Sequence, residues 1–139
     1  KLATMSVACR LDIEVIRVSD APDTTCLWDT TDPYVMLTLH DGQFDAGSSH
    51  QGESFKTTVK TDAGSKAEFK ESFTMNKPEN MDVVRISLYD SNVTIDELLG
   101  SVDLDLKTIP LGAHVDREVT VVKGGKETGK IDLKIKMQP

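Results

Sequence analysis

The stretch Leu11-Asp12-Ile13-Glu14-Val15 alternates apolar with acidic residues, so its apolar side chains share one face, as a half-buried β-strand requires. The same period of two recurs in seven further segments, at residues 34–40, 55–61, 69–75, 83–89, 101–106, 115–122 and 130–137. Turn residues such as Asp41-Gly42 and Gly124-Gly125 separate these segments. Short strands at this spacing predict an all-β fold, an eight-stranded antiparallel β-sandwich.

The connections between these segments carry little helical signal. No segment sustains a 3.6-residue apolar period, although a short helical turn fits residues 95–99 or 106–109. In the segment 55–61, Phe55 and Val59 are expected to face the core. The connection 40–54 is long, small and polar, and we expect it to form a mobile tip.

Length and composition describe one globular domain. The chain has 139 residues, and we assign 1–10 to an N-terminal extension and 11–139 to the domain. A net charge of −7 argues against nucleic-acid binding. No run of about 18 apolar residues occurs, as a membrane-spanning helix would need. Two cysteines, Cys9 and Cys26, do not make a disulfide framework and favour a reducing, cytoplasmic location.

Several landmarks follow one another in a characteristic order. They are Asp32-Pro33-Tyr34-Val35, the basic strand Phe55–Thr61, the segment Lys66–Phe73, the segment Val84–Asp90 and Leu98-Leu99-Gly100. In order and spacing they resemble the landmarks of C2 domains over about ninety residues. The resemblance implies a C2-like Greek key. Because a strand at 130–137 follows the common core and none precedes Leu11, it also implies the permuted topology called type II.

The resemblance further implies a calcium site in the first and third loops. Calcium-binding C2 domains use five acidic positions, and Asp32 and Asp90 match two of them. The first-loop partner position holds Cys26, a soft ligand unsuited to Ca²⁺. The third loop holds Asn92 and, at its end, Glu97 in the remaining positions.

Three further acids could complete such a site: Asp96 lies beside Glu97, and Asp23 or Asp29 could substitute in the first loop. Ca²⁺ prefers six to eight oxygen ligands, and each missing carboxylate weakens binding, so we expect weak or absent calcium affinity. The alternative is that Asp32 and Asp90 cap backbone amides of the loops.

Membrane contact is the second property that the resemblance implies. Leu27 and Trp28 lie in a loop that family members push into membranes, where an aromatic beside an aliphatic side chain favours the bilayer interface. Val93 and Ile95 are the corresponding apolar residues of the third loop. The alternative is that Trp28 folds back onto the sandwich.

The basic strand is a candidate headgroup-binding surface. Lys56 and Lys60 share one face, and Lys70 follows on the adjoining segment. Each basic residue near an anionic surface contributes about 1 kcal/mol. Glu68 and Glu71 interleave with them and weaken the patch, so ordinary surface lysines are the alternative.

No motif points to catalysis. The segment 124–130 is close to a phosphate-binding loop, but Ile131 replaces the required Ser or Thr and a strand follows instead of a helix. We therefore expect a non-catalytic module with no small-molecule substrate, which docks peripherally on an anionic phospholipid membrane with weak or absent calcium dependence. The alternative is a calcium-independent protein-interaction or scaffold domain, whose partner is another protein.

Overall fold

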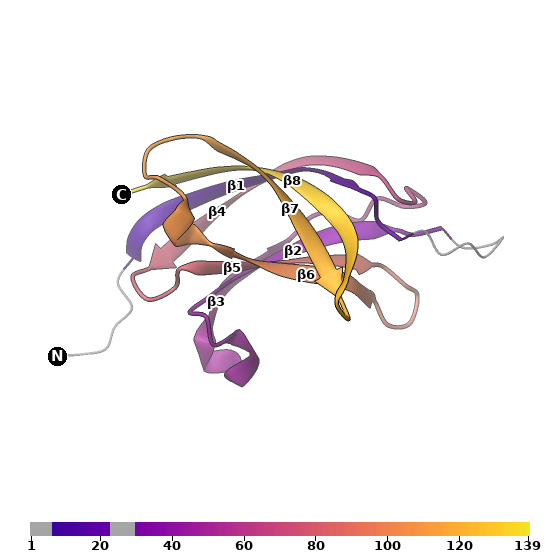
Figure 1. Ribbon diagram of the computed structural model, residues 1–139, viewed down its shortest axis with the longest axis horizontal. Helices are drawn as coiled ribbons and strands as arrows, with labels where there is room; N and C mark the ends of the chain where they lie inside the picture. Colours follow the sequence, from indigo (N-terminus) through magenta and orange to yellow (C-terminus); the bar gives the residue numbers. More distant parts are fainter. Residues whose placement is uncertain (1–6, 23–29) are drawn as a thin grey trace.

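The computed structural model describes residues 7–22 and 30–139 and confirms an all-β fold of eight strands in two packed layers (Figure 1). The strands are β1 (Val7–Ser19), β2 (Pro33–His40), β3 (Gln51–Lys56), β4 (Ala67–Pro78), β5 (Val83–Asp90), β6 (Glu97–Asp105), β7 (Val115–Lys123) and β8 (Lys126–Gln138). Within the described residues, three short 3₁₀ helices join them, η1 (Phe44–Ala46), η2 (Ser48–His50) and η3 (Leu106–Thr108).

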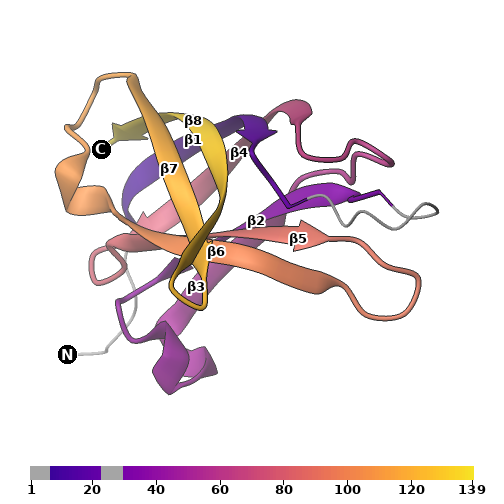
Figure 2. The same cartoon turned by 45° about the vertical axis from the view of Figure 1, so that its right-hand side comes forward.

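The strands follow one another in the order β3-β2-β5-β6-β7-β8-β1-β4. Figures 1 and 2 show that β3, β2, β5 and β6 form one layer, whereas β7, β8, β1 and β4 form the other. Neighbouring strands pair antiparallel, and β6 and β7 share only the position Ser101–Val122, where the order passes from one layer to the other. The assignment to type II stays a prediction.

The predicted alternation is confirmed in the core. Ile13 of β1, Leu37 of β2, Ile86 of β5 and Ile135 of β8 are fully buried between the layers. Burying one such side chain contributes about 1.5–3 kcal/mol, so these inward faces are the main reason that the layers pack.

Two predicted boundaries differ from the structure. β1 begins at Val7, paired with Pro78, four residues before Leu11, where the predicted first strand begins. β3 covers 51–56 and not 55–61, and Val59 is 39% exposed instead of facing the core. Beyond Lys56 the chain still bonds to β2, from the Thr57 N–H to Val35 O and from the Lys60 N–H to Pro33 O. Between them, Thr58 turns to β4 of the other layer, where its backbone N–H and hydroxyl donate to the Glu71 carboxylate.

The predicted helical turns had opposite outcomes. The turn at 106–109 is confirmed as η3, whose first turn is capped by the Asp105 side chain accepting from the Lys107 N–H at 3.0 Å. The turn at 95–99 is wrong, because Glu97 already pairs with Asp90 and begins β6.

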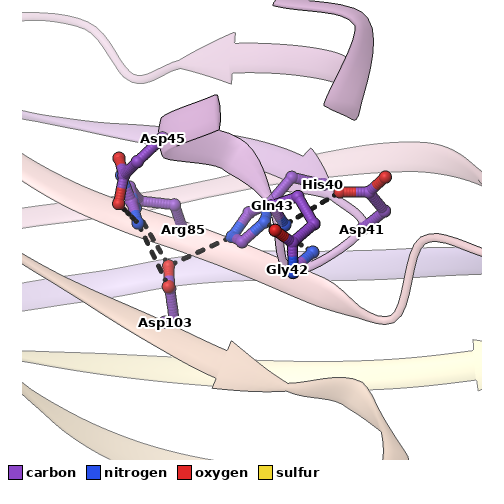
Figure 3. Close-up of polar contacts among 7 residues, drawn as sticks. All are labelled: His40, Asp41, Gly42, Gln43, Asp45, Arg85 and Asp103. Carbon is purple, nitrogen blue, oxygen red and sulfur yellow. Dashed lines mark hydrogen bonds and ion pairs between the residues drawn. The ribbon is translucent and has the colours of Figure 1, made fainter. Parts of the chain in front are cut away.

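Residues 40–54 were expected to form a mobile tip. In the structure residues 41–50 fold onto the outer face of the first layer (Figure 3), and β3 begins at Gln51. Asp45 forms an ion pair with Arg85 of β5 at 2.8 Å. The Phe44 ring packs against the Arg85 guanidinium, which lies 4.5 Å from the Phe44 centroid, and against the His40 ring, with centroids 5.2 Å apart. Arg85 also binds Asp103 at 3.0 Å, so a single arginine anchors the connection to two strands.

His40 completes this anchor beneath the connection. Its side chain is 1% exposed, its Nδ1 accepts from the Gly42 N–H at 3.0 Å, and its Nε2 lies 3.2 Å from Asp103 Oδ1. Because Nδ1 is an acceptor, Nε2 carries the proton that it donates to Asp103. Neutral His40 thus satisfies both ring nitrogens, as a buried imidazole requires.

Candidate functional site

Three connections meet at one end of the sandwich, on the right in Figures 1 and 2: the described residues of 20–32, the connection 57–66 and the connection 91–96. We call this the loop end. Backbone hydrogen bonds join them, from Gly64 N–H to Thr31 O at 3.0 Å and from Ser91 N–H to Asp32 O at 3.0 Å. The predicted site residues Asp23, Cys26, Leu27, Trp28 and Asp29 lie outside the described residues.

Asp32 and Asp90 lie together at the base of these loops. Asp90 is 2% exposed, and its Oδ1 accepts from the Asp32 N–H at 2.9 Å. Asp32 Oδ1 in turn accepts from the Asp62 N–H at 2.5 Å. Both carboxylates therefore hold loop backbone in place, which is the capping role weighed against calcium binding.

Asp96 is engaged within its own loop and with β2. Its Oδ2 accepts from the Tyr34 hydroxyl at 2.5 Å and its Oδ1 from the Asn92 N–H at 3.0 Å. The Asn92 side-chain amide donates to the Ile95 carbonyl at 3.0 Å. The hydrogen bonds that Asp96 accepts from the Tyr34 hydroxyl and the Asn92 N–H lower the pKa of Asp96. Burial and the neighbouring Asp96 carboxylate raise the pKa of Tyr34.

The described carboxylates do not form a metal cluster. Among residues 7–22 and 30–139, no group of three or more histidine, cysteine, aspartate or glutamate side chains could hold an ion. Glu97 is exposed at the start of β6, opposite Asp90. This donor set does not fit Ca²⁺, which needs six to eight oxygens. A metal role for Asp32, Asp90, Asn92, Asp96 and Glu97 stays a prediction.

The tip of the loop 91–96 is apolar and exposed. Val93 has an exposed fraction of 104% and Ile95 of 82%, the two highest among the large exposed apolar side chains of the described residues. Figures 1 and 2 show this loop extending beyond the ends of β5 and β6. These two predicted membrane-contact residues are therefore available to a partner surface.

The three predicted headgroup lysines have different surroundings. Lys56 Nζ lies 5.4 Å from the centroid of the Tyr34 ring, and Lys60 Nζ lies 5.6 Å from that of Phe69. Lys70 is exposed, with a φ of 52°. The acids expected to weaken the patch are engaged elsewhere, since Glu68 pairs with Arg17 and Glu71 binds Thr58.

Sequence reasoning did not find the role of Tyr34. Its ring is 4% exposed and stacks on Tyr89 of the neighbouring strand, with centroids 5.2 Å apart and planes 9° apart. The alternation of β2 places Tyr34 on the outer face, but no local pattern indicates a hydroxyl partner 62 residues away. Lys123 was also missed: its Nζ donates to the Leu98 carbonyl at 2.8 Å, beside the same loop.

Solved structures with the same fold include a single C2 domain of plant extended synaptotagmin 1, with 23% identity, a TM-score of 0.80, and coverage of 96% of this chain and 97% of that chain. Human GIVD cytosolic phospholipase A2, in complex with methyl gamma-linolenyl fluorophosphonate, has 23% identity and a TM-score of 0.75. The match covers 97% of this chain but 18% of the phospholipase chain. The calcium-bound pair of C2 domains from extended synaptotagmin 2 has 20% identity and a TM-score of 0.75, with coverage of 96% of this chain and 47% of that chain.

A search of curated protein sequences found no significant match. The helices in the described part of the chain are too short to cross a membrane. The family model of the C2 domain matches residues 9–121, which is most of the sequence. The chain belongs to the C2 domain family.

Proposed function

We propose that this C2 domain docks peripherally on anionic phospholipid membranes, with weak or absent calcium dependence, through the apolar tip of the loop 91–96. One observation carries the proposal: Val93 and Ile95 are almost fully exposed on a loop whose ends are joined by hydrogen bonds from Asn92 to Asp96 and to the Ile95 carbonyl. Membership in the C2 family supports membrane or lipid binding as the general role.

The energetics suit reversible docking. Complete transfer of a Val or Ile side chain out of water is worth about 1.5–3 kcal/mol, so the pair supplies roughly 3–6 kcal/mol before the costs of association. This free energy is typical of reversible binding at the membrane interface and is far smaller than that of a membrane-spanning helix.

Charge decides the orientation of such docking. The net charge of −7 repels an anionic surface, so contact must occur where lysines lie close to the tip. Lys56 contacts the Tyr34 ring on one side of the loop, and Lys123 contacts Leu98 on the other. Each such lysine contributes about 1 kcal/mol near an anionic membrane. Lys60 and Lys70, the other predicted headgroup lysines, stay candidates for such contact.

Vesicle co-sedimentation tests the proposal. Vesicles of phosphatidylcholine alone and mixed with phosphatidylserine are compared, each with chelator and with calcium. We expect pelleting on the anionic vesicles in chelator. The double variant Val93→Ser/Ile95→Ser is expected to bind about 100-fold more weakly, because it loses roughly 3 kcal/mol of apolar transfer.

Leu111→Ser is the matched control. Leu111 is 61% exposed, but it bridges to Met137 near the end of β8, away from the loop end. This variant should pellet like the parent chain. Pelleting of Val93→Ser/Ile95→Ser equal to that of the parent would refute contact through the loop tip. Absence of pelleting under every condition would refute membrane docking and favour the protein-interaction alternative.

A further inference from the structure

We infer that Tyr34 is a positioning residue for the apolar tip: its hydroxyl, acting through Asp96, holds the loop 91–96 in its projecting form without a cation. The role in docking rests on the proposed function, whereas the bracing itself rests on contacts within the chain. The residue that contacts the membrane is Val93 or Ile95, and Tyr34 acts through the loop backbone.

The bracing closes the base of the loop. Both carboxylate oxygens of Asp96 are occupied, Oδ2 by the Tyr34 hydroxyl and Oδ1 by the Asn92 N–H. The Asn92 side chain adds a second bond across the loop, to the Ile95 carbonyl. Residues 93–95 are thereby left as a three-residue tip between fixed ends, which directs Val93 and Ile95 into solvent.

Tyr34 connects this loop to the rigid part of the fold. It lies in β2, paired with Tyr89 of β5, and its ring is held between the Tyr89 ring and the Lys56 side chain. Its 4% exposure leaves the ring little freedom, so the hydroxyl is a fixed donor. A donor fixed on a strand is a better anchor for a loop than another loop residue would be.

The hydrogen-bonding groups of Asp96 and Asn92 suit this bracing. Asp96 is ionised at neutral pH, since its pKa is lowered by the Tyr34 hydroxyl and the Asn92 N–H, and a carboxylate accepts stronger hydrogen bonds than a neutral group does. Asn92 is needed as a donor: an aspartate there would lack the amide that binds Ile95 O and would place a second negative charge beside Asp96. In this arrangement Asn92 acts as a brace of the loop.

Preorganisation is the expected benefit. A loop already held in its binding form loses less conformational freedom when it docks, which raises affinity without any new contact. Loss of one such hydrogen bond corresponds to about a fivefold change in an equilibrium constant.

The test uses Tyr34→Phe, which keeps the ring, its stacking and its burial and removes only the hydroxyl. Amide hydrogen exchange of Asn92, measured without membranes, reports the bracing directly. Partition onto phosphatidylserine-containing vesicles in chelator reports docking. We expect Asn92 exchange to accelerate about fivefold and vesicle affinity to fall about fivefold. Asn92→Asp is expected to weaken docking in the same direction.

Thr74→Val is the matched control, because the Thr74 hydroxyl also donates to an aspartate, Asp12, at 2.8 Å, but on the outer face of the other layer. It should change neither readout. Unchanged Asn92 exchange in Tyr34→Phe overturns the bracing. Faster exchange with unaltered vesicle affinity overturns the positioning role, provided that Val93→Ser/Ile95→Ser still weakens binding. The failure of the proposed function is recognised separately, when that double variant binds as the parent chain does.

Discussion

Replacing Gly100 with alanine should destabilise the fold at the corner where the two layers join. Gly100 lies in β6 beside Ser101, which pairs with Val122 of β7. A Cβ at Gly100 would overlap Thr128 Oγ1 and would approach the Val122 backbone N and a methyl group of Val121 to 3.2 Å each. The corner also carries the start of β6, so its geometry supports the loop 91–96.

The magnitude follows from three terms. Relieving the overlap requires the Thr128 side chain to rotate away from the Val121 carbonyl, which gives up a hydrogen bond of 3.4 Å, worth about 0.5–1.5 kcal/mol net. Overpacking against the Val121 side chain and the β7 backbone costs about 1–3 kcal/mol. Removing a glycine from the unfolded chain offsets about 0.4–1 kcal/mol. The expected loss in free energy of unfolding is therefore about 2 kcal/mol.

Urea denaturation at constant pH measures this loss, with Ser101→Ala as a neighbouring control expected to cost little. A double-mutant cycle identifies the cause: Thr128→Ala removes the overlapping oxygen, so Gly100→Ala/Thr128→Ala should recover about 1 kcal/mol relative to the sum of the single variants. A Gly100→Ala variant as stable as the parent would refute the reasoning. Strict additivity in the cycle would show that the overlap with Thr128 is not the origin of the loss.

In Asp82→Ala the Lys77 ammonium should lose its carboxylate partner at 2.6 Å and keep its hydrogen bond to the Pro78 carbonyl at 3.1 Å. Because the Lys77 side chain is 8% exposed, this variant should lose about 2 kcal/mol in free energy of unfolding, measured by urea denaturation, whereas Lys77→Met should be closer to neutral. Equal stabilities of Asp82→Ala and the parent would contradict this. Although burial raises the pKa of Asp103, hydrogen bonds from Arg85 and His40 bring it below the ordinary 3.8, and Arg85 likewise lowers the pKa of Asp45. Each ionised carboxylate therefore stabilises the folded state at pH above the ordinary carboxyl pKa. This stabilisation is lost as the pH falls through the lowered pKa of the folded state. Arg85→Gln should remove this contribution, so the unfolding free energies of parent and variant, measured against pH, should converge in acid; a constant gap would show that the anchor is not electrostatic.

Local sequence determined most of the strands, because burial of one face imposes a period of two that short segments display by themselves. Ile13 and Ile135 show this, since each is apolar among polar neighbours and each is fully buried. The end of β3 was not readable in this way. Alternation continues past Lys56, yet the regular strand ends there and Thr58 bonds to Glu71, a residue of the other layer.

Long-range contacts likewise decided the connection 41–50. Its small polar residues are typical of a mobile loop, but Arg85, 40 residues from Asp45, anchors it to β5. A pattern within the loop cannot indicate this, because the anchoring cation lies on a strand whose own alternation explains it as a surface residue.

At the loop end, the sequence by itself determined the residue types: an acidic set that predicts weak or absent calcium binding, and the apolar pair Val93 and Ile95. Only the tertiary structure decided how these groups are used. It places the Tyr34 hydroxyl against Asp96 and leaves the apolar pair in solvent. The physical reason is that hydrogen bonding joins groups that are close in space, and β2 and the loop 91–96 become neighbours only when the sheet has formed.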